Sequence, residues 1–121
     1  MSGQNTYLES DGKSVAVTLS ATVSKNQVAY AEGWLGISNR DGVSGDVITL
    51  SVDRREYQFT VPSSLSVSKG ATVYVDVTDL TGHIPDDTAY YTATGSNRVA
   101  LFKATAAKDG NNVVTGMLIA G

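Results

Sequence analysis

Residues 14–20 read SVAVTLS, and this stretch decides the fold class. Val15, Val17 and Leu19 alternate there with small or hydroxyl-bearing residues. A period of two is typical of a β-strand with one buried face, because successive side chains on a strand point to opposite faces of the sheet. The segment therefore predicts a half-buried strand.

Runs of the same β-rich kind follow at short intervals along the chain. They are 26–31 (NQVAYA), 33–38 (GWLGIS), 46–52 (DVITLSV), 55–61 (REYQFTV), 71–77 (ATVYVDV), 88–93 (TAYYTA), 98–106 (RVALFKATA) and 112–119 (NVVTGMLI). Turn-forming Gly, Asn and Asp residues separate most of them. No window carries apolar residues at helical spacing over three turns. The pattern predicts an all-β fold, a small antiparallel β-barrel or sandwich of about eight short strands.

The length of the chain indicates one domain, since 121 residues lie within the common size of a single domain. The first 13 residues, MSGQNTYLESDGK, are mostly polar, and Tyr7 and Leu8 are their only large apolar side chains beyond Met1. We expect residues 1–13 to form a flexible N-terminal arm and residues 14–121 to form the β domain.

The composition excludes several classes of function. A hydrophobic content of 41% with 17% charged residues argues against a disordered chain. The net charge is −3 and the basic residues are scattered along the sequence, which argues against direct binding of nucleic acid. The absence of cysteine excludes disulfides and thiolate chemistry. No signal-peptide or membrane-spanning pattern is present, so we expect synthesis in the cytoplasm and no membrane partner.

Few residues could support catalysis or bind a metal. His83 is the sole histidine, and in a loop with Gly and Pro we expect a solvated side chain rather than a catalytic base. Zinc sites usually draw three or four ligands from His and Cys, which one histidine without cysteine cannot supply. Asp76, Asp79, Asp86 and Asp87 offer oxygen ligands, but their spacing matches no EF-hand loop, so a solvated acidic loop is expected. The chain also lacks a P-loop. We expect no enzyme activity, no cofactor and no metal.

The aromatic residues allow two interpretations. The set comprises Trp34, Tyr30, Tyr57, Tyr74, Tyr90 and Tyr91. It could form a face that stacks on sugars, or it could pack in the core and between subunits. An exposed Trp34 in one plane with tyrosines and an acidic loop would favour glycan recognition, whereas burial of Trp34 would favour packing.

Between residues 23 and 119, six short motifs follow one another. They are AEGWLGIS at 31–38, SGDVITLSV at 44–52, RREYQFTVP at 54–62, KGATVYVDV at 69–77, RVALFKATAA at 98–107 and DGNNVVTGMLI at 109–119. Their order resembles that of the phage capsid cement or decoration proteins, small head proteins sometimes labelled as RecA/RadA-type recombinases. The missing P-loop contradicts the recombinase label. The chain departs from the family pattern at Phe102 and Lys103, where a Gly is common, and in its longer loop at 79–87.

The resemblance implies a β-barrel or β-tulip-like fold and a structural role on the virion. It implies binding to the major capsid protein at the outer capsid surface, stabilisation of the expanded head, and a homo-oligomer, for which we expect a trimer with a dimer as the main alternative. An arm can add a strand to a capsid sheet edge, and Asn5, Thr6, Tyr7 and Leu8 are the expected capsid contacts. The alternative function is that of a carbohydrate- or cell-surface-binding β-sandwich module of a phage particle.

Overall fold

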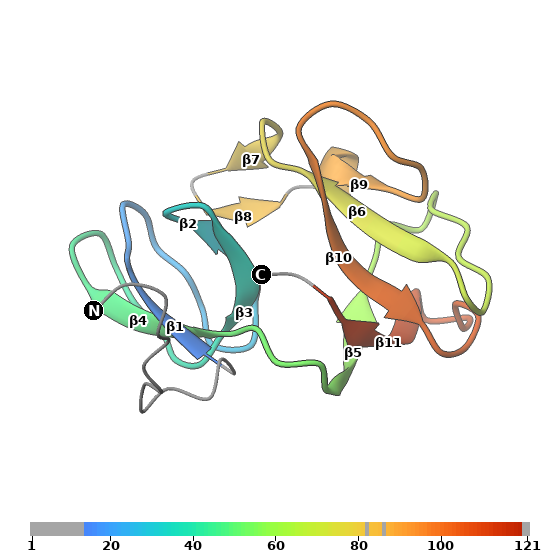
Figure 1. Ribbon diagram of the computed structural model, residues 1–121, viewed down its shortest axis with the longest axis horizontal. Coiled ribbons are helices and arrows are strands. Elements are labelled where there is room, and N and C mark those ends of the chain that lie inside the picture. The colour runs from blue at the N-terminus through green and yellow to red at the C-terminus, as the bar shows by residue number, and fades with distance from the viewer. Residues whose placement is uncertain (1–13, 82, 86, 120–121) are drawn as a thin grey trace, which may run out of the picture.

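The computed structural model describes residues 14–119 except 82 and 86, and its described part is built from short strands (Figure 1). The strands are β1 Ser14–Thr18, β2 Val28–Ala31, β3 Trp34–Ser38, β4 Val47–Ser51, β5 Glu56–Thr60, β6 Thr72–Asp76, β7 Leu80–Thr81, β8 Ile84–Pro85, β9 Tyr90–Tyr91, β10 Arg98–Ala104 and β11 Val113–Leu118. The one helical element among the described residues is a 3₁₀ turn, η1 Asp87–Ala89. The all-β prediction is confirmed.

The strands form two main antiparallel sheets. The four-stranded sheet has the order β1-β4-β3-β2, and the five-stranded sheet has the order β5-β11-β10-β6-β9. Figure 1 shows the first sheet on the left and the second on the right. Neither order returns to its first strand, so the arrangement fits the sandwich rather than a closed barrel.

Two short segments differ from the prediction. Within the loop expected at 79–87, β7 and β8 pair as a two-stranded hairpin. The strand expected at 88–93 is reduced to β9, which follows η1 directly. Strands of two residues are too short to display a period in sequence, so their side chains gave no signal.

The hairpin between β2 and β3 has the tightest connection in the four-stranded sheet. Ala31 lies opposite Trp34, and the two residues between them have positive φ angles, 51° for Glu32 and 85° for Gly33. Two positive φ angles define a type I′ turn, whose twist matches that of the flanking strands. Glu32 Oε1 also accepts a hydrogen bond from the backbone N–H of Thr18 at the end of β1. The sheet therefore curls until its two edge strands approach each other.

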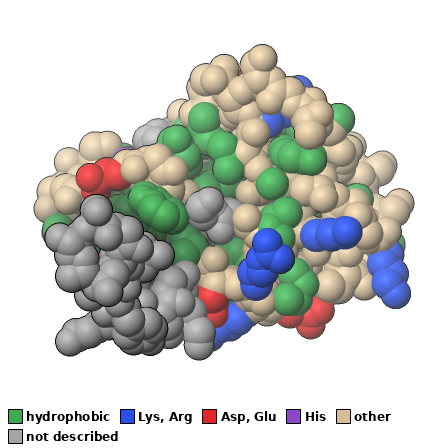
Figure 2. Space-filling model, in the orientation of Figure 1, with side chains coloured by type: hydrophobic (Ala, Val, Ile, Leu, Met, Phe, Trp, Pro, Cys, Tyr) green, Lys and Arg blue, Asp and Glu red, His purple; other side chains and the backbone are tan. Residues whose placement is uncertain are grey.

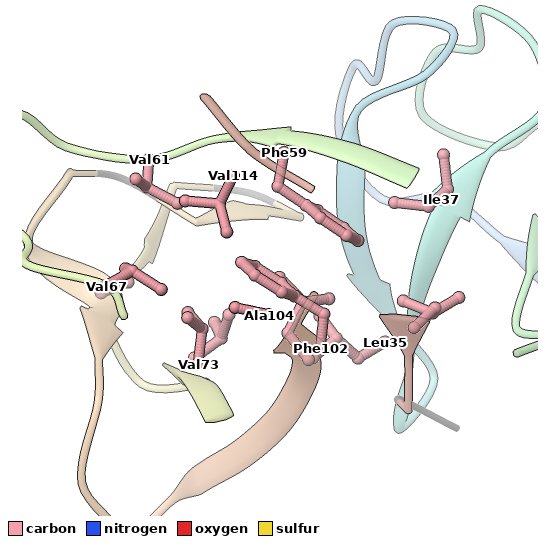
Figure 3. Close-up of a cluster of buried hydrophobic side chains, with 13 residues drawn as sticks. Leu35, Ile37, Phe59, Val61, Val67, Val73, Phe102, Ala104 and Val114 are labelled. Carbon is pink, nitrogen blue, oxygen red and sulfur yellow. The ribbon is translucent and has the colours of Figure 1, made fainter. Parts of the chain in front are cut away.

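Two clusters of buried side chains hold the sheets. The smaller cluster fills the curl of the four-stranded sheet and consists of Val17, Leu19, Val23, Ala29, Ala31, Ile48 and Leu50. The larger cluster lies under the five-stranded sheet, where the rings of Phe59 and Phe102 stack with centroids 4.0 Å apart and planes inclined by 3°. Leu35 and Ile37 of β3 belong to this larger cluster and lie beside these rings (Figure 3). β3 thus joins the two sheets through one core.

The segment between β4 and β5 crosses from one sheet to the other and is fixed by Asp53. Its carboxylate accepts hydrogen bonds from Tyr57 Oη at 2.9 Å and from Arg55 Nε. Burial raises the pKa of Asp53, but the hydrogen bonds from Tyr57 and Arg55 and the charge of Arg55 lower it below its ordinary value. Burial and the neighbouring Asp53 raise the pKa of Tyr57.

The lowered pKa of Asp53 predicts a pH-dependent contribution to stability. A carboxyl group with a depressed folded-state pKa stabilises the protein above its unfolded pKa, and this contribution is lost as the pH falls through the folded pKa. We expect the difference in unfolding free energy between wild type and Asp53→Asn to be constant near neutral pH and to shrink below about pH 4. Urea unfolding across this range measures it. In Tyr57→Phe, which lacks one donor, the contribution of Asp53 should be smaller and its loss should be complete at a higher pH than in wild type. Identical profiles would contradict the assignment.

Candidate functional site

The four capsid contacts expected from sequence, Asn5, Thr6, Tyr7 and Leu8, lie outside the described residues. Four features of the described residues bear on function, namely the histidine, the acidic loop, the aromatic residues and the exposed faces.

His83 is buried, with 9% of its surface exposed, and it lies at the seam of the curled four-stranded sheet. Its Nδ1 lies 2.7 Å from the carbonyl oxygen of Tyr30, and its Nε2 accepts a hydrogen bond of 2.7 Å from the backbone N–H of Ser20. The backbone oxygen of His83 accepts a further bond from the N–H of Tyr30. Because the N–H of Ser20 donates to Nε2, that nitrogen carries no proton. The ring proton therefore lies on Nδ1, which donates a hydrogen bond to the carbonyl oxygen of Tyr30.

The expectation of a solvated His83 is wrong. Among the described residues, no strand ladder joins the segment after β1 to edge strand β2, and the His83 side chain links the two. Both ring nitrogens are occupied by backbone groups, so the ring serves the fold in this arrangement. A change at His83 is therefore expected to affect folding.

We expect His83→Ala to lower the free energy of unfolding by about 1–3 kcal/mol, because it leaves the N–H of Ser20 and the carbonyl of Tyr30 without their partner. Ser20→Ala is the matched control, because it removes only the hydroxyl, which lies 3.0 Å from Nε2, and keeps the backbone bond. The control should change stability by less than about 0.5 kcal/mol. Equal losses in urea unfolding of the two variants would contradict the role of the ring.

The acidic loop is organised by local hydrogen bonds. Asp76 Oδ1 accepts bonds from the Thr78 backbone N–H at 2.9 Å and from Thr78 Oγ1 at 2.6 Å. These bonds, and more weakly the charge of Arg98, lower the pKa of Asp76. Among the residues that the structure describes, no group of three or more His, Asp or Glu side chains is placed to hold a metal ion. Asp86 and the side chain of Asp87 lie outside that description.

The aromatic residues are divided between different surfaces. Trp34 is 39% exposed at the β2–β3 hairpin. This exposure is one of the features that would favour glycan recognition. The side chains of Tyr30, Tyr57 and Tyr90 pack instead against the larger core cluster.

The two remaining tyrosines lie on the five-stranded sheet. Tyr74 and Tyr91 face each other across β6 and β9, and the guanidinium of Arg98 lies 3.5 Å from the centroid of the Tyr91 ring. These two tyrosines therefore lie on a different sheet from Trp34.

The outer face of the five-stranded sheet carries a basic–apolar patch. It consists of Arg54, Lys69, Lys103, Thr105, Met117 and Ile119, which line a shallow hollow. Figure 2 shows Lys and Arg side chains beside exposed hydrophobic side chains over this sheet. The sequence interpretation treated the basic residues as scattered, and the sheet order brings three of them together. In the sequence, the alternation along their strands indicated that the side chains of Lys103 and Met117 point away from the core.

A groove of about 530 Å³ separates the edge strands β2 and β5. Val28, Ile37 and Phe59 contribute apolar surface to it, and Asn26 and Gln58 contribute amides. No charged side chain is among its described lining residues. Its volume lies within the range of small-molecule pockets, about 300–1,000 Å³, and its lining suits a neutral ligand.

Comparison with known proteins found no matching family model, no similar curated protein and no similar solved structure. Within the described residues, no helix has the length and apolar character needed to cross a membrane.

Proposed function

We propose that this protein is a non-catalytic structural component of a phage virion, which binds the outer surface of the capsid and stabilises the expanded head. One observation carries the proposal. The motifs that resemble decoration proteins coincide with the elements that build the two sheets: residues 31–38 contain β3, residues 69–77 contain β6, and residues 109–119 contain β11. The resemblance implied a β-barrel or β-tulip-like fold, and the observed fold shares its all-β class but is a sandwich rather than a closed barrel.

Such a role requires binding to the capsid but no catalytic step. A ligand that binds only the expanded, folded head stabilises that state by mass action. Several large apolar side chains are exposed on the described surface and suit protein contacts, namely Trp34, Val43, Val47 and Met117. We propose the major capsid protein as the partner and the capsid surface as the location.

We expect a homo-oligomer, a trimer with a dimer as the main alternative. Once one subunit binds the capsid, the others bind at a high effective concentration, so several such contacts strengthen binding together. Light scattering of the free protein, and the stoichiometry on heads, test this part. A monomer in both settings would contradict it.

The central experiment uses purified protein, expanded heads that lack it, and unexpanded procapsids. We expect saturable binding to expanded heads in a sedimentation assay, no binding to procapsids, and a higher melting temperature of the decorated heads. Equal binding to both particles, or no binding to either, would contradict the proposed function.

The arm is tested by deleting residues 2–13. If Asn5, Thr6, Tyr7 and Leu8 add a strand to the capsid, the truncated protein should melt as the full chain does but occupy heads poorly. Ordering the arm opposes binding by about 1–2 kcal/mol per residue in backbone entropy, so pairing or burial must compensate. Unchanged occupancy would exclude the arm as an anchor, and a lower melting temperature would assign it to the fold.

The exposure of Trp34 supports a second candidate function, recognition of a carbohydrate or cell surface. Aromatic rings present an apolar face that can pack against a ligand. Trp34 is the only tryptophan, so its fluorescence reports directly on ligand contact. Titration with oligosaccharides should then shift the emission of wild type, and Trp34→Ala should lose retention on the same glycans. An unchanged emission across a broad glycan panel would contradict this candidate.

A further inference from the structure

We infer that the basic–apolar patch on the five-stranded sheet docks an acidic surface of the capsid subunit, one in which carboxylates flank an apolar side chain. The inference rests on the proposed function for the identity of the partner. It goes beyond that function by assigning the contact to one face and by stating the chemistry of the partner.

The register of the sheet places the centre of the patch. Met117 on β11 lies opposite Lys103 on β10 and opposite Glu56 on β5. Glu56 is engaged by Thr105, whose Oγ1 donates a 2.8 Å hydrogen bond to Glu56 Oε2. Met117 is 36% exposed in the middle of this row. The patch therefore has an apolar centre with a lysine directly beside it.

The remaining cations come from turns at the rim. Arg54 precedes β5, and Lys69 precedes Gly70, whose N–H donates a 2.8 Å hydrogen bond to the carbonyl of Ala104 at the end of β10. This bond holds the Lys69 turn against the sheet. Both side chains are exposed and line the same hollow as Lys103.

The cations of the patch differ from those that serve the fold. Arg55 pairs with Asp53, and Lys108 donates to the carbonyl oxygens of Ser63 and Leu65. By contrast, three cations form neither an ion pair nor a side-chain hydrogen bond among the described residues, namely Arg54, Lys69 and Lys103. Three unpaired positive charges on a chain of net charge −3 form a local field that attracts carboxylates.

The apolar centre distinguishes a protein partner from a nucleic acid. Protein interfaces combine an apolar, desolvated core with a polar rim, and complementary charges at the rim steer association. Met117 and Ile119 supply such a core here, whereas phosphate binding gains nothing from them. The overall negative charge also opposes a polyanion.

The experiment measures binding to expanded heads of wild type and of single charge reversals Lys69→Glu and Lys103→Glu. Both positions are exposed, so melting temperatures should match wild type. We expect each reversal to weaken the apparent affinity about tenfold, and Met117→Ser to weaken it by a similar factor. The matched control is Lys25→Glu, an exposed lysine on the loop before β2 that lies outside the patch, which should bind as wild type does.

The outcomes separate the two proposals. If wild type binds heads and the reversals bind equally well, the patch assignment is overturned and the capsid function stands. If wild type binds no heads, both are overturned. Retention of wild type on duplex DNA at about 150 mM salt, lost in Lys103→Glu, would overturn the assignment of an acidic protein partner.

Discussion

Replacing Phe102 by alanine is expected to lower the free energy of unfolding by about 3–5 kcal/mol. Phe102 is fully buried, and its ring stacks on that of Phe59. The backbone of Gly116 lies against the ring, and a glycine offers no side chain that could move into the space left behind. A small domain is stable by only about 5–15 kcal/mol, so this variant should be close to unfolding.

Urea unfolding followed by circular dichroism measures this loss. Phe102→Leu is the graded control, because it keeps most of the buried volume and should lose less than the alanine variant. Met117→Ala removes a partly exposed side chain from the neighbouring strand and should change stability far less. If Phe102→Ala were no more harmful than Met117→Ala, the stacked pair would not be the centre of the core.

Gly116→Ala should be harmful for the opposite reason, overpacking. A Cβ atom at this position would lie 2.4 Å from Phe102 Cδ2 and 2.9 Å from the carbonyl oxygen of Lys103. Forcing an extra methyl into a packed core costs about 1–3 kcal/mol or more, because the ring and the strand backbone must shift.

The chain offers a matched control in Gly110→Ala. A Cβ at Gly110 meets no heavy atom within 4 Å, and its φ lies outside the left-handed region. Its substitution should leave stability within about 0.5 kcal/mol of wild type. Combining Gly116→Ala with Phe102→Leu should cost less than the sum of the two single changes, since a smaller side chain relieves the contact. Strict additivity would contradict the steric explanation.

Most of the strands could be predicted because each has one buried face. Val15, Val17 and Leu19 alternate with polar residues, and β1 lies where this alternation begins. β10 differs, because the adjacent residues Leu101 and Phe102 are both buried where its register shifts between Ala100 and Phe102. The β7–β8 hairpin escaped prediction because two residues cannot show a period, and its position depends on the backbone bond from Tyr30 to His83.

The candidate site could not be predicted, because its parts come together only through long-range pairing. Arg54, Lys69 and Lys103 are far apart in sequence, and the order β5-β11-β10 makes them neighbours. His83 was assigned to solvent because its partners, Ser20 and Tyr30, are 63 and 53 residues away. The local sequence pattern indicates which face of a strand is buried. Which strand pairs with it depends on residues far away in the chain.

The position of β11 between β5 and β10 has a consequence for synthesis on the ribosome. β1 to β4 pair among themselves, so residues 14–51 can form their sheet as soon as they emerge. Among the described strands, β5 has β11 as its only neighbour in the sheet, and β11 is the last to be translated. Until it appears, Phe59, Leu35 and Ile37 lack the cover of the completed core. Nascent chains halted before residue 113 should therefore be cut readily by protease around β5, whereas chains that expose β11 should become resistant.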